Sequence, residues 1–144
     1  MFLDASAIIA ILSEEAEAEV LITAIASVSR IACSPLVVYE ASLGLARKKW
    51  VGLHGEHKPM PAAFLEKAEA IVRDLFEEIG AVEMEITPEI GRAAIKVAGI
   101  FGRGSGHPAK LNFGDCFAYA SARAVKMPLL FKGDDFAQTD IETI

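Results

Sequence analysis

The sequence is poor in cysteine: only Cys33 and Cys116 are present, far apart and without a Cys-x-x-Cys pair. A disulfide framework and a cysteine-based zinc site both need more cysteines at closer spacing, so neither is expected. Because both cysteines stand in apolar surroundings, we expect two buried and reduced thiols.

Long apolar runs are also missing. No stretch reaches the roughly 18 consecutive apolar residues of a membrane span. The opening Met-Phe-Leu-Asp has neither the basic start nor the cleavage site of a signal peptide. We therefore expect a cytoplasmic protein with no membrane partner. The 144 residues, 53% of them hydrophobic, predict one compact domain over residues 1–144.

The chain lacks an excess of positive charge, since its formal net charge is −6. A protein that coats nucleic acid through bulk charge would be basic, so that class is excluded. If the chain binds RNA, it must use local basic patches and bound cations. A divalent ion would partly offset the acidic residues.

Several catalytic motifs are absent. The Gly-rich segment 102–107 lacks the Gly-Lys-Ser/Thr of a P-loop, and no Gly-x-Ser-x-Gly supports a serine hydrolase. His54 and His57 are three residues apart with no cysteine nearby, which does not favour a zinc site. These absences leave the acidic residues as the main carriers of chemistry.

Hydrophobic periodicity and caps predict alternating strands and helices. Strands are expected over 1–3, 30–33, 81–86 and 128–131, with a short addition near Ile141, and helices over 5–12, 14–26, 35–49, 62–79, 88–101 and 113–126. In the second helix, Val20, Leu21 and Ile25 are expected to face inward, and residues 50–61 are expected to form a loop. This order predicts an α/β fold with a mainly parallel sheet of four to five strands flanked by helices on both faces.

Four acidic residues fall where such a sheet would gather them. Asp4 and Asp134 follow strands, Glu40 lies inside a helix that follows a strand, and Asp115 begins a helix. Ligands bind beyond the carboxyl ends of the strands in open α/β sheets. Carboxylates in apolar surroundings need a partner or a metal ion. The pattern predicts a Mg²⁺ site with nuclease chemistry, in which Asp4 and Asp115 ligate the ion while Glu40 and Asp134 act directly or through water.

Each acid also has a purely structural interpretation. Asp4 can cap the next helix, Asp115 can stabilise a helix N-terminus, and Asp134 with Asp135 can belong to a Gly-Asp-Asp turn. Two other functions stay open as well. One is a different Mg²⁺-dependent phosphoryl hydrolase, although a haloacid-type phosphatase would need a second Asp where the chain has Ser6. The other is a non-catalytic module whose acids hold a basic partner segment.

Three segments resemble a known family. Met-Phe-Leu-Asp-Ala-Ser-Ala is similar to the opening of PIN-domain proteins, and Leu-Asn-Phe-Gly-Asp-Cys-Phe-Ala-Tyr-Ala and Leu-Leu-Phe-Lys-Gly-Asp-Asp-Phe-Ala-Gln-Thr-Asp resemble VapC toxins of bacterial toxin–antitoxin pairs. The resemblance covers nearly the whole chain. It implies a PIN-like three-layer α/β/α fold and a metal-dependent endoribonuclease using Mg²⁺, with Mn²⁺ as a substitute. It also implies a homodimer and a cognate VapB-type antitoxin that silences the enzyme.

The resemblance assigns site residues position by position. Asp4, Glu40 and Asp115 match the three central acids, and Ser6 matches the small hydroxyl residue near the metal. Many members carry Thr-x-Asp directly after the last strand, where this chain has Phe131-Lys132-Gly133. The fourth acid is then supplied by Asp134, one residue further on, with Asp135 in a structural role or as the alternative.

An acidic pocket that admits RNA needs cations at its rim. Such side chains contact phosphates and position the strand without reading its sequence. An ordinary solvated surface is the other interpretation of any single one. The candidates are Arg47, Lys48, Lys49, Lys58, Arg103, Lys110 and Lys132.

Overall fold

A computed structural model describes residues 1–144. At its centre lies a parallel sheet of four short strands in the order β3-β2-β1-β4. The strands are β1 (Phe2–Leu3), β2 (Ala32–Cys33), β3 (Val82–Glu83) and β4 (Leu129–Leu130). Phe2 pairs with Ala32 on one side and with Leu129 on the other, so β1 and β2 are central strands. The predicted α/β fold with a parallel sheet is confirmed.

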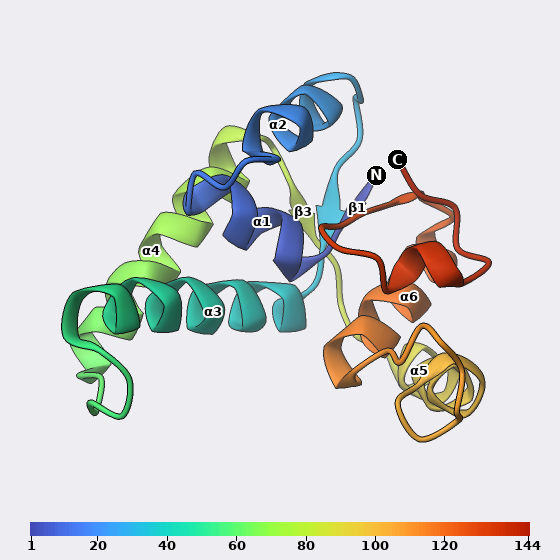
Figure 1. The fold of residues 1–144 in the computed structure, drawn as a ribbon. Helices are drawn as coiled ribbons and strands as arrows, with labels where there is room; N and C mark the ends of the chain where they lie inside the picture. The colour runs from blue at the N-terminus through green and yellow to red at the C-terminus, as the bar shows by residue number, and fades with distance from the viewer.

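Helices cover both faces of this sheet. Figure 1 shows α1 to α4 gathered on one side of the strands and α5 with α6 on the other. Parallel strands require such crossover connections, because the chain must return to the same end of the sheet before the next strand begins. The helices are α1 (Ala5–Leu12), α2 (Ala18–Ala26), α3 (Pro35–His54), α4 (Ala62–Glu78), α5 (Pro88–Phe101) and α6 (Phe113–Val125), followed by the 3₁₀ turn η1 (Phe136–Gln138).

Local sequence signals set most helix boundaries. Ser34 and Thr87 each precede a proline and accept a hydrogen bond from the backbone N–H three residues on, which begins α3 and α5. Asn112 and the first turn of α6 form a capping box. After the end of α4, Gly80 adopts a φ of 65°, a left-handed conformation that glycine reaches without strain and that stops the helix from continuing.

Four expectations from the sequence are wrong in detail. Helix α3 continues to His54 rather than ending near residue 49, so the loop covers only residues 55–61. Helix α2 begins at Ala18, and Val20 is 70% exposed instead of facing the core. Strand β3 is only two residues long, and Val82 is 67% exposed. The tail forms a single bridge between Thr143 and Leu129 rather than a strand.

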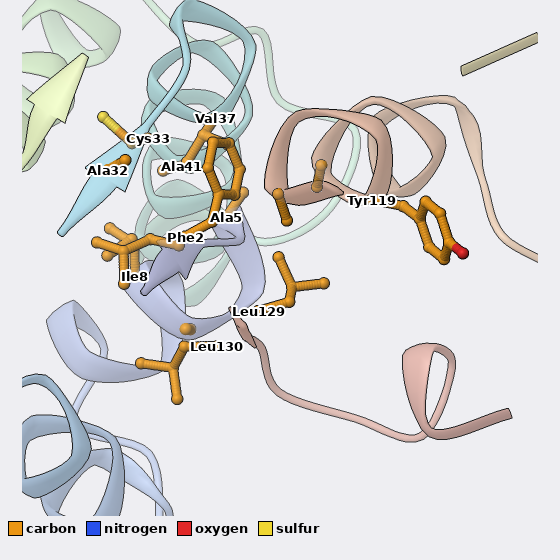
Figure 2. Close-up of a cluster of buried hydrophobic side chains, with 14 of the residues drawn as sticks. Phe2, Ala5, Ile8, Ala32, Cys33, Val37, Ala41, Tyr119, Leu129 and Leu130 are labelled. Atoms are coloured by element: carbon orange, nitrogen blue, oxygen red, sulfur yellow. The ribbon is translucent and has the colours of Figure 1, made fainter. Parts of the chain in front are cut away.

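The core lies between the sheet and the two helical layers. Figure 2 shows Phe2 directed toward Val37 and Ala41 of α3, and all three side chains are buried. Cys33 and Cys116 are buried free thiols, as expected. Burial raises the pKa of Cys33 to about 12, so this thiol stays protonated. No helix is both long and apolar enough to cross a membrane.

Candidate functional site

A hollow of about 370 Å³ lies where β1 ends and α3 and α6 begin. Its wall includes Asp4, Glu40 and Asp115, three of the acids singled out in the sequence. Asp4 follows β1 directly, Glu40 stands in the second turn of α3, and Asp115 stands in the first turn of α6. The fold therefore brings together side chains that are 36 and 75 positions apart in the sequence. We call this hollow the acid pocket.

Asp4 is the most deeply placed of the three, with only 5% of its surface exposed. Its Oδ2 accepts hydrogen bonds from the backbone N–H of Ser6 at 2.9 Å and from Ser6 Oγ at 2.5 Å. Ser6 Oγ in turn accepts from the backbone N–H of Lys132 at 2.9 Å, so it ties Asp4 to the segment after β4. Burial raises the pKa of Asp4, and the bonds from Ser6 oppose that effect.

Glu40 reaches the acid pocket across the N-terminus of α6. A Cβ atom placed on Gly114 would clash with both carboxylate oxygens of Glu40, so this close approach needs a glycine in α6. Burial is the first cause that raises the pKa of Glu40 to about 7, and the charges of Asp4 and Asp115 add to it. The carboxyl group is thus half protonated near neutral pH when no cation is bound.

Asp115 serves two purposes at once. Its Oδ2 accepts from the backbone N–H of Asn112 at 2.6 Å, and Asn112 Oδ1 accepts from the backbone N–H of Asp115 at 3.1 Å. Burial raises the pKa of Asp115 to about 6, and the charges of Asp4 and Asp135 also raise it. The Asn112 bond and the charge of Arg103 act in the opposite direction. The reciprocal bonds fix the side chain while the carboxylate still lines the acid pocket.

The structure does not place Asp134 with the other three acids. Asp134 and Asp135 are both exposed and neither lines the acid pocket, and Asp134 is not among the charges that shift the pKa of the other acids. Asp135, one residue further on, raises the pKa of both Asp4 and Asp115. The electrostatics therefore single out Asp135, and a role for Asp134 stays a prediction.

Cations stand around the acids but do not neutralise them. Arg47 lines the acid pocket, and Arg103 acts on Asp115 only through its charge. Lys132 and Lys48 both pair with Glu15, a residue that the sequence gave no reason to select. This clamp joins the segment after β4, the connection after α1 and helix α3. Lys48 and Lys132, two of the seven candidate rim cations, therefore form ion pairs within the protein.

The donor set of the acid pocket fits a hard divalent cation. Glu40 and Asp115 each have a pKa raised by the charge of Asp4, and none of the three carboxylates forms an ion pair with a protein cation. Mg²⁺ binds one or two carboxylates, keeps several waters and meets substrate phosphates. No three His, Cys, Asp or Glu side chains lie together closely enough to hold a metal ion among themselves. One or two of these carboxylates would therefore hold the ion, with water at its other positions.

Comparisons with known proteins agree with this arrangement. Residues 1–142 match the PIN domain family. The chain is 37% identical over 141 residues to a VapC ribonuclease of Rhizobium meliloti, covering 97% of this chain and 98% of the relative. It is 36% identical over 142 residues to ribonuclease VapC28 of Mycobacterium tuberculosis, covering 99% and 96%.

Two solved structures share the fold. The chain superimposes on the crystal structure of Mycobacterium tuberculosis VapC20, a sarcin-ricin loop cleaving toxin, with a TM-score of 0.70 at 15% identity, covering 99% of this chain and 97% of that one. A toxin–antitoxin complex from Klebsiella pneumoniae gives a TM-score of 0.63 at 18% identity, covering 94% and 89%. At such low identity these matches concern the fold alone. The family match and the near full-length relatives show that the chain belongs to the PIN-domain family, among its VapC members.

Proposed function

We propose that the protein is a metal-dependent endoribonuclease and the toxin of a toxin–antitoxin pair. The observation that carries the proposal is the acid pocket, where three carboxylates from separate parts of the chain meet without an ion pair to a protein cation, and where the charge of Asp4 raises the pKa of both Glu40 and Asp115. Such a pocket at the carboxyl end of a parallel sheet is suited to a divalent ion and a phosphodiester. The relatives named VapC ribonucleases support the choice of RNA as substrate.

Asp4 and Asp115 are the side chains that would hold Mg²⁺, with Mn²⁺ as a substitute. Ser6 and Asn112 fix their orientation through hydrogen bonds, so little reorganisation is needed when a ligand arrives. A bound divalent ion supplies a water of lowered pKa and charge stabilisation at phosphorus. Glu40, with a pKa of about 7 in the protein alone, would accept a proton in the acid pocket or hold a water there by a hydrogen bond.

We infer that Asp135, rather than Asp134, is the fourth acid. Asp135 acts on both Asp4 and Asp115 through its charge, whereas Asp134 acts on neither. The prediction is that Asp135→Asn lowers the rate of RNA cleavage by more than tenfold, as the loss of a supporting ligand does, while Asp134→Asn stays within about twofold of the wild type. The reverse order of the two variants would restore Asp134 to the site.

The decisive experiment is cleavage of total RNA by the purified protein in Mg²⁺, in Mn²⁺ and in EDTA. Discrete fragments should form only with metal and should vanish in Asp4→Asn and Asp115→Asn. Asp134→Asn is a matched control because it removes an acid on the neighbouring loop. Intact cleavage by both site variants would refute the proposal. Turnover of a small phosphomonoester with RNA left untouched would favour another phosphoryl hydrolase.

The remaining expectations concern partners and location. We propose a VapB-type antitoxin as the silencing partner, a homodimer in solution, and a cytoplasmic setting. A toxin–antitoxin complex among the structural neighbours supports the first of these. Large apolar side chains remain exposed on several helices, among them Ile22, Ile95 and Ile100, which is consistent with burial in an assembly. Light scattering of the purified protein, alone and with the product of a neighbouring small gene, tests the two assembly states.

A further inference from the structure

A second hollow, polar and about 600 Å³ in volume, opens beside the acid pocket. Gly44 and Arg47 of α3 line both hollows, so the two are adjacent. We call the second hollow the basic groove. Apart from Val51, its lining is polar or glycine. The lining residues are Gly44, Arg47, Lys48, Val51, Glu56, His57 and Lys58.

The groove is a built feature of the end of α3. The chain turns back at Gly55, with a φ of 80°, and at His57, with a φ of 65°. Trp50 Nε1 donates a hydrogen bond to the carbonyl oxygen of Lys58 at 3.1 Å. The Trp50 ring also lies 5.0 Å from Phe64 of α4 in an edge-on contact. These contacts hold loop 55–61 against α3 and keep Lys58 at the groove.

The lining carries three cations, Arg47, Lys48 and Lys58, and one carboxylate, Glu56, although the chain as a whole is acidic. Lys48 is paired with Glu15, and Glu56 lies 3.8 Å from His57, a contact that is an ion pair only when His57 is protonated. No ion pair in the structure involves Arg47 or Lys58. Two unpaired cations in the basic groove thus lie next to three unpaired carboxylates in the acid pocket. The basic groove is suited to phosphate oxygens, and the acid pocket to a metal ion.

We propose that the basic groove binds the phosphodiester backbone of single-stranded RNA, on one side of the bond that the acid pocket hydrolyses. The inference rests on the proposed function and names how that site receives its substrate. Arg47, at the junction of the hollows, contacts the phosphate nearest the acid pocket, and Lys58 contacts one further along. Such contacts position a strand without reading its bases. A flexible single strand can follow both hollows, and loop 55–61 contributes Lys58, one of the rim cations predicted from the sequence.

Binding in EDTA tests the groove independently of cleavage. Anisotropy of a fluorescein-labelled single-stranded RNA of about ten nucleotides is measured from 50 to 200 mM salt, with wild type, Arg47→Gln, Lys58→Gln and the double variant. Each lost phosphate contact should reduce the slope of log affinity against log salt by about 0.7, and the double variant by about 1.4. Lys96→Gln, on exposed α5, is the matched control and should bind as the wild type does. Unchanged melting temperatures verify folding.

The outcomes separate the groove from the proposed function. The groove proposal is refuted if the double variant binds RNA with the affinity and salt slope of the wild type. It is also refuted if the wild type does not bind RNA. Displacement of RNA by polyglutamate at lower concentration than by unlabelled RNA also overturns it, in favour of an acidic protein segment. If the groove variants bind weakly but the wild type never cleaves in any metal, the groove stands and the ribonuclease proposal fails. In cleavage, Lys58→Gln should raise KM for the long RNA with kcat unchanged, and should leave both constants for a dinucleotide as in wild type.

Discussion

Removing the charge of Glu40 should stabilise the metal-free protein at alkaline pH. The folded structure raises the pKa of Glu40 from 4.5 to about 7, mainly through burial and then through Asp4 and Asp115. A raised pKa in an acid means that the folded state holds a proton that the unfolded state has lost. The associated stability is complete below pH 4.5 and is lost as the pH rises through about 7.

The size of the effect follows from the shift. One pKa unit corresponds to about 1.4 kcal/mol, so the shift of Glu40 sets an upper limit of about 3 kcal/mol. The actual effect should be smaller, because neighbouring charges can rearrange and the Glu40 side chain is partly solvated. We therefore expect Glu40→Gln to raise the free energy of unfolding by about 1–2 kcal/mol at pH 8. For a chain of this size, that gain corresponds to roughly 3–8 °C in melting temperature.

The assay is thermal unfolding in EDTA at pH 8 and pH 4.5, with wild type, Glu40→Gln and Glu77→Gln. Glu77 is exposed on α4 and forms no ion pair, so its variant controls for the loss of a surface carboxylate. The gain of Glu40→Gln should appear at pH 8 and nearly vanish at pH 4.5. Mg²⁺ at pH 8 should then raise the melting temperature of the wild type more than that of Glu40→Gln. Destabilisation at pH 8, or an equal gain at both pH values, would refute the account of the acid pocket.

Three further substitutions or reagents probe the same structure. Gly114→Ala should lower RNA cleavage about 10–100-fold, because its methyl group displaces the Glu40 carboxylate, while melting stays equal or rises, since alanine favours the helix; a stable and fully active variant would contradict the contact. Ser121→Ala should raise the free energy of unfolding in urea by up to about 1 kcal/mol, because the buried hydroxyl has no partner, and a clear loss would reveal one. Cys33, with a pKa of about 12, should resist alkylation at pH 8 until urea unfolds the chain, and rapid labelling of the native protein would argue against its burial.

The sequence predicted best those features that local chemistry decides. Ser34, Thr87 and Asn112 each place a hydrogen-bond acceptor at a helix start, and all three begin helices where expected. The end of α3 was predicted near residue 49, five residues before its actual end at His54. Trp50 contacts Phe64 of α4 and the Lys58 carbonyl, and these contacts with later segments stabilise the added turn. Tertiary packing overrides a weak local preference in such cases.

The residues of the acid pocket also differ in how far local sequence signals could predict them. Asp4 and Asp115 could be selected from sequence because each stands at a fixed point, a strand end and a first helical turn. Glu40 was also selected from the sequence, but the space left by Gly114, through which it reaches the pocket, is visible only in the structure. The choice between Asp134 and Asp135 depends on the turn around Gly133, whose φ of 109° is a conformation that glycine permits and the sequence pattern does not specify.

The structural and functional interpretations of these acids are compatible. Asp4 does cap α1, through Oδ2, and Asp115 does complete a capping box, also through Oδ2. A cap uses the lone pairs of one carboxylate oxygen, and a carboxylate has two oxygens, so the same side chain can be oriented by the protein and still face a ligand. The caps therefore hold both acids in place before any cation arrives. Because Asp4 and Asp115 also begin helices, their asparagine variants remove charge while keeping an oxygen for the cap, and they separate the chemistry of the pocket from the stability of the fold.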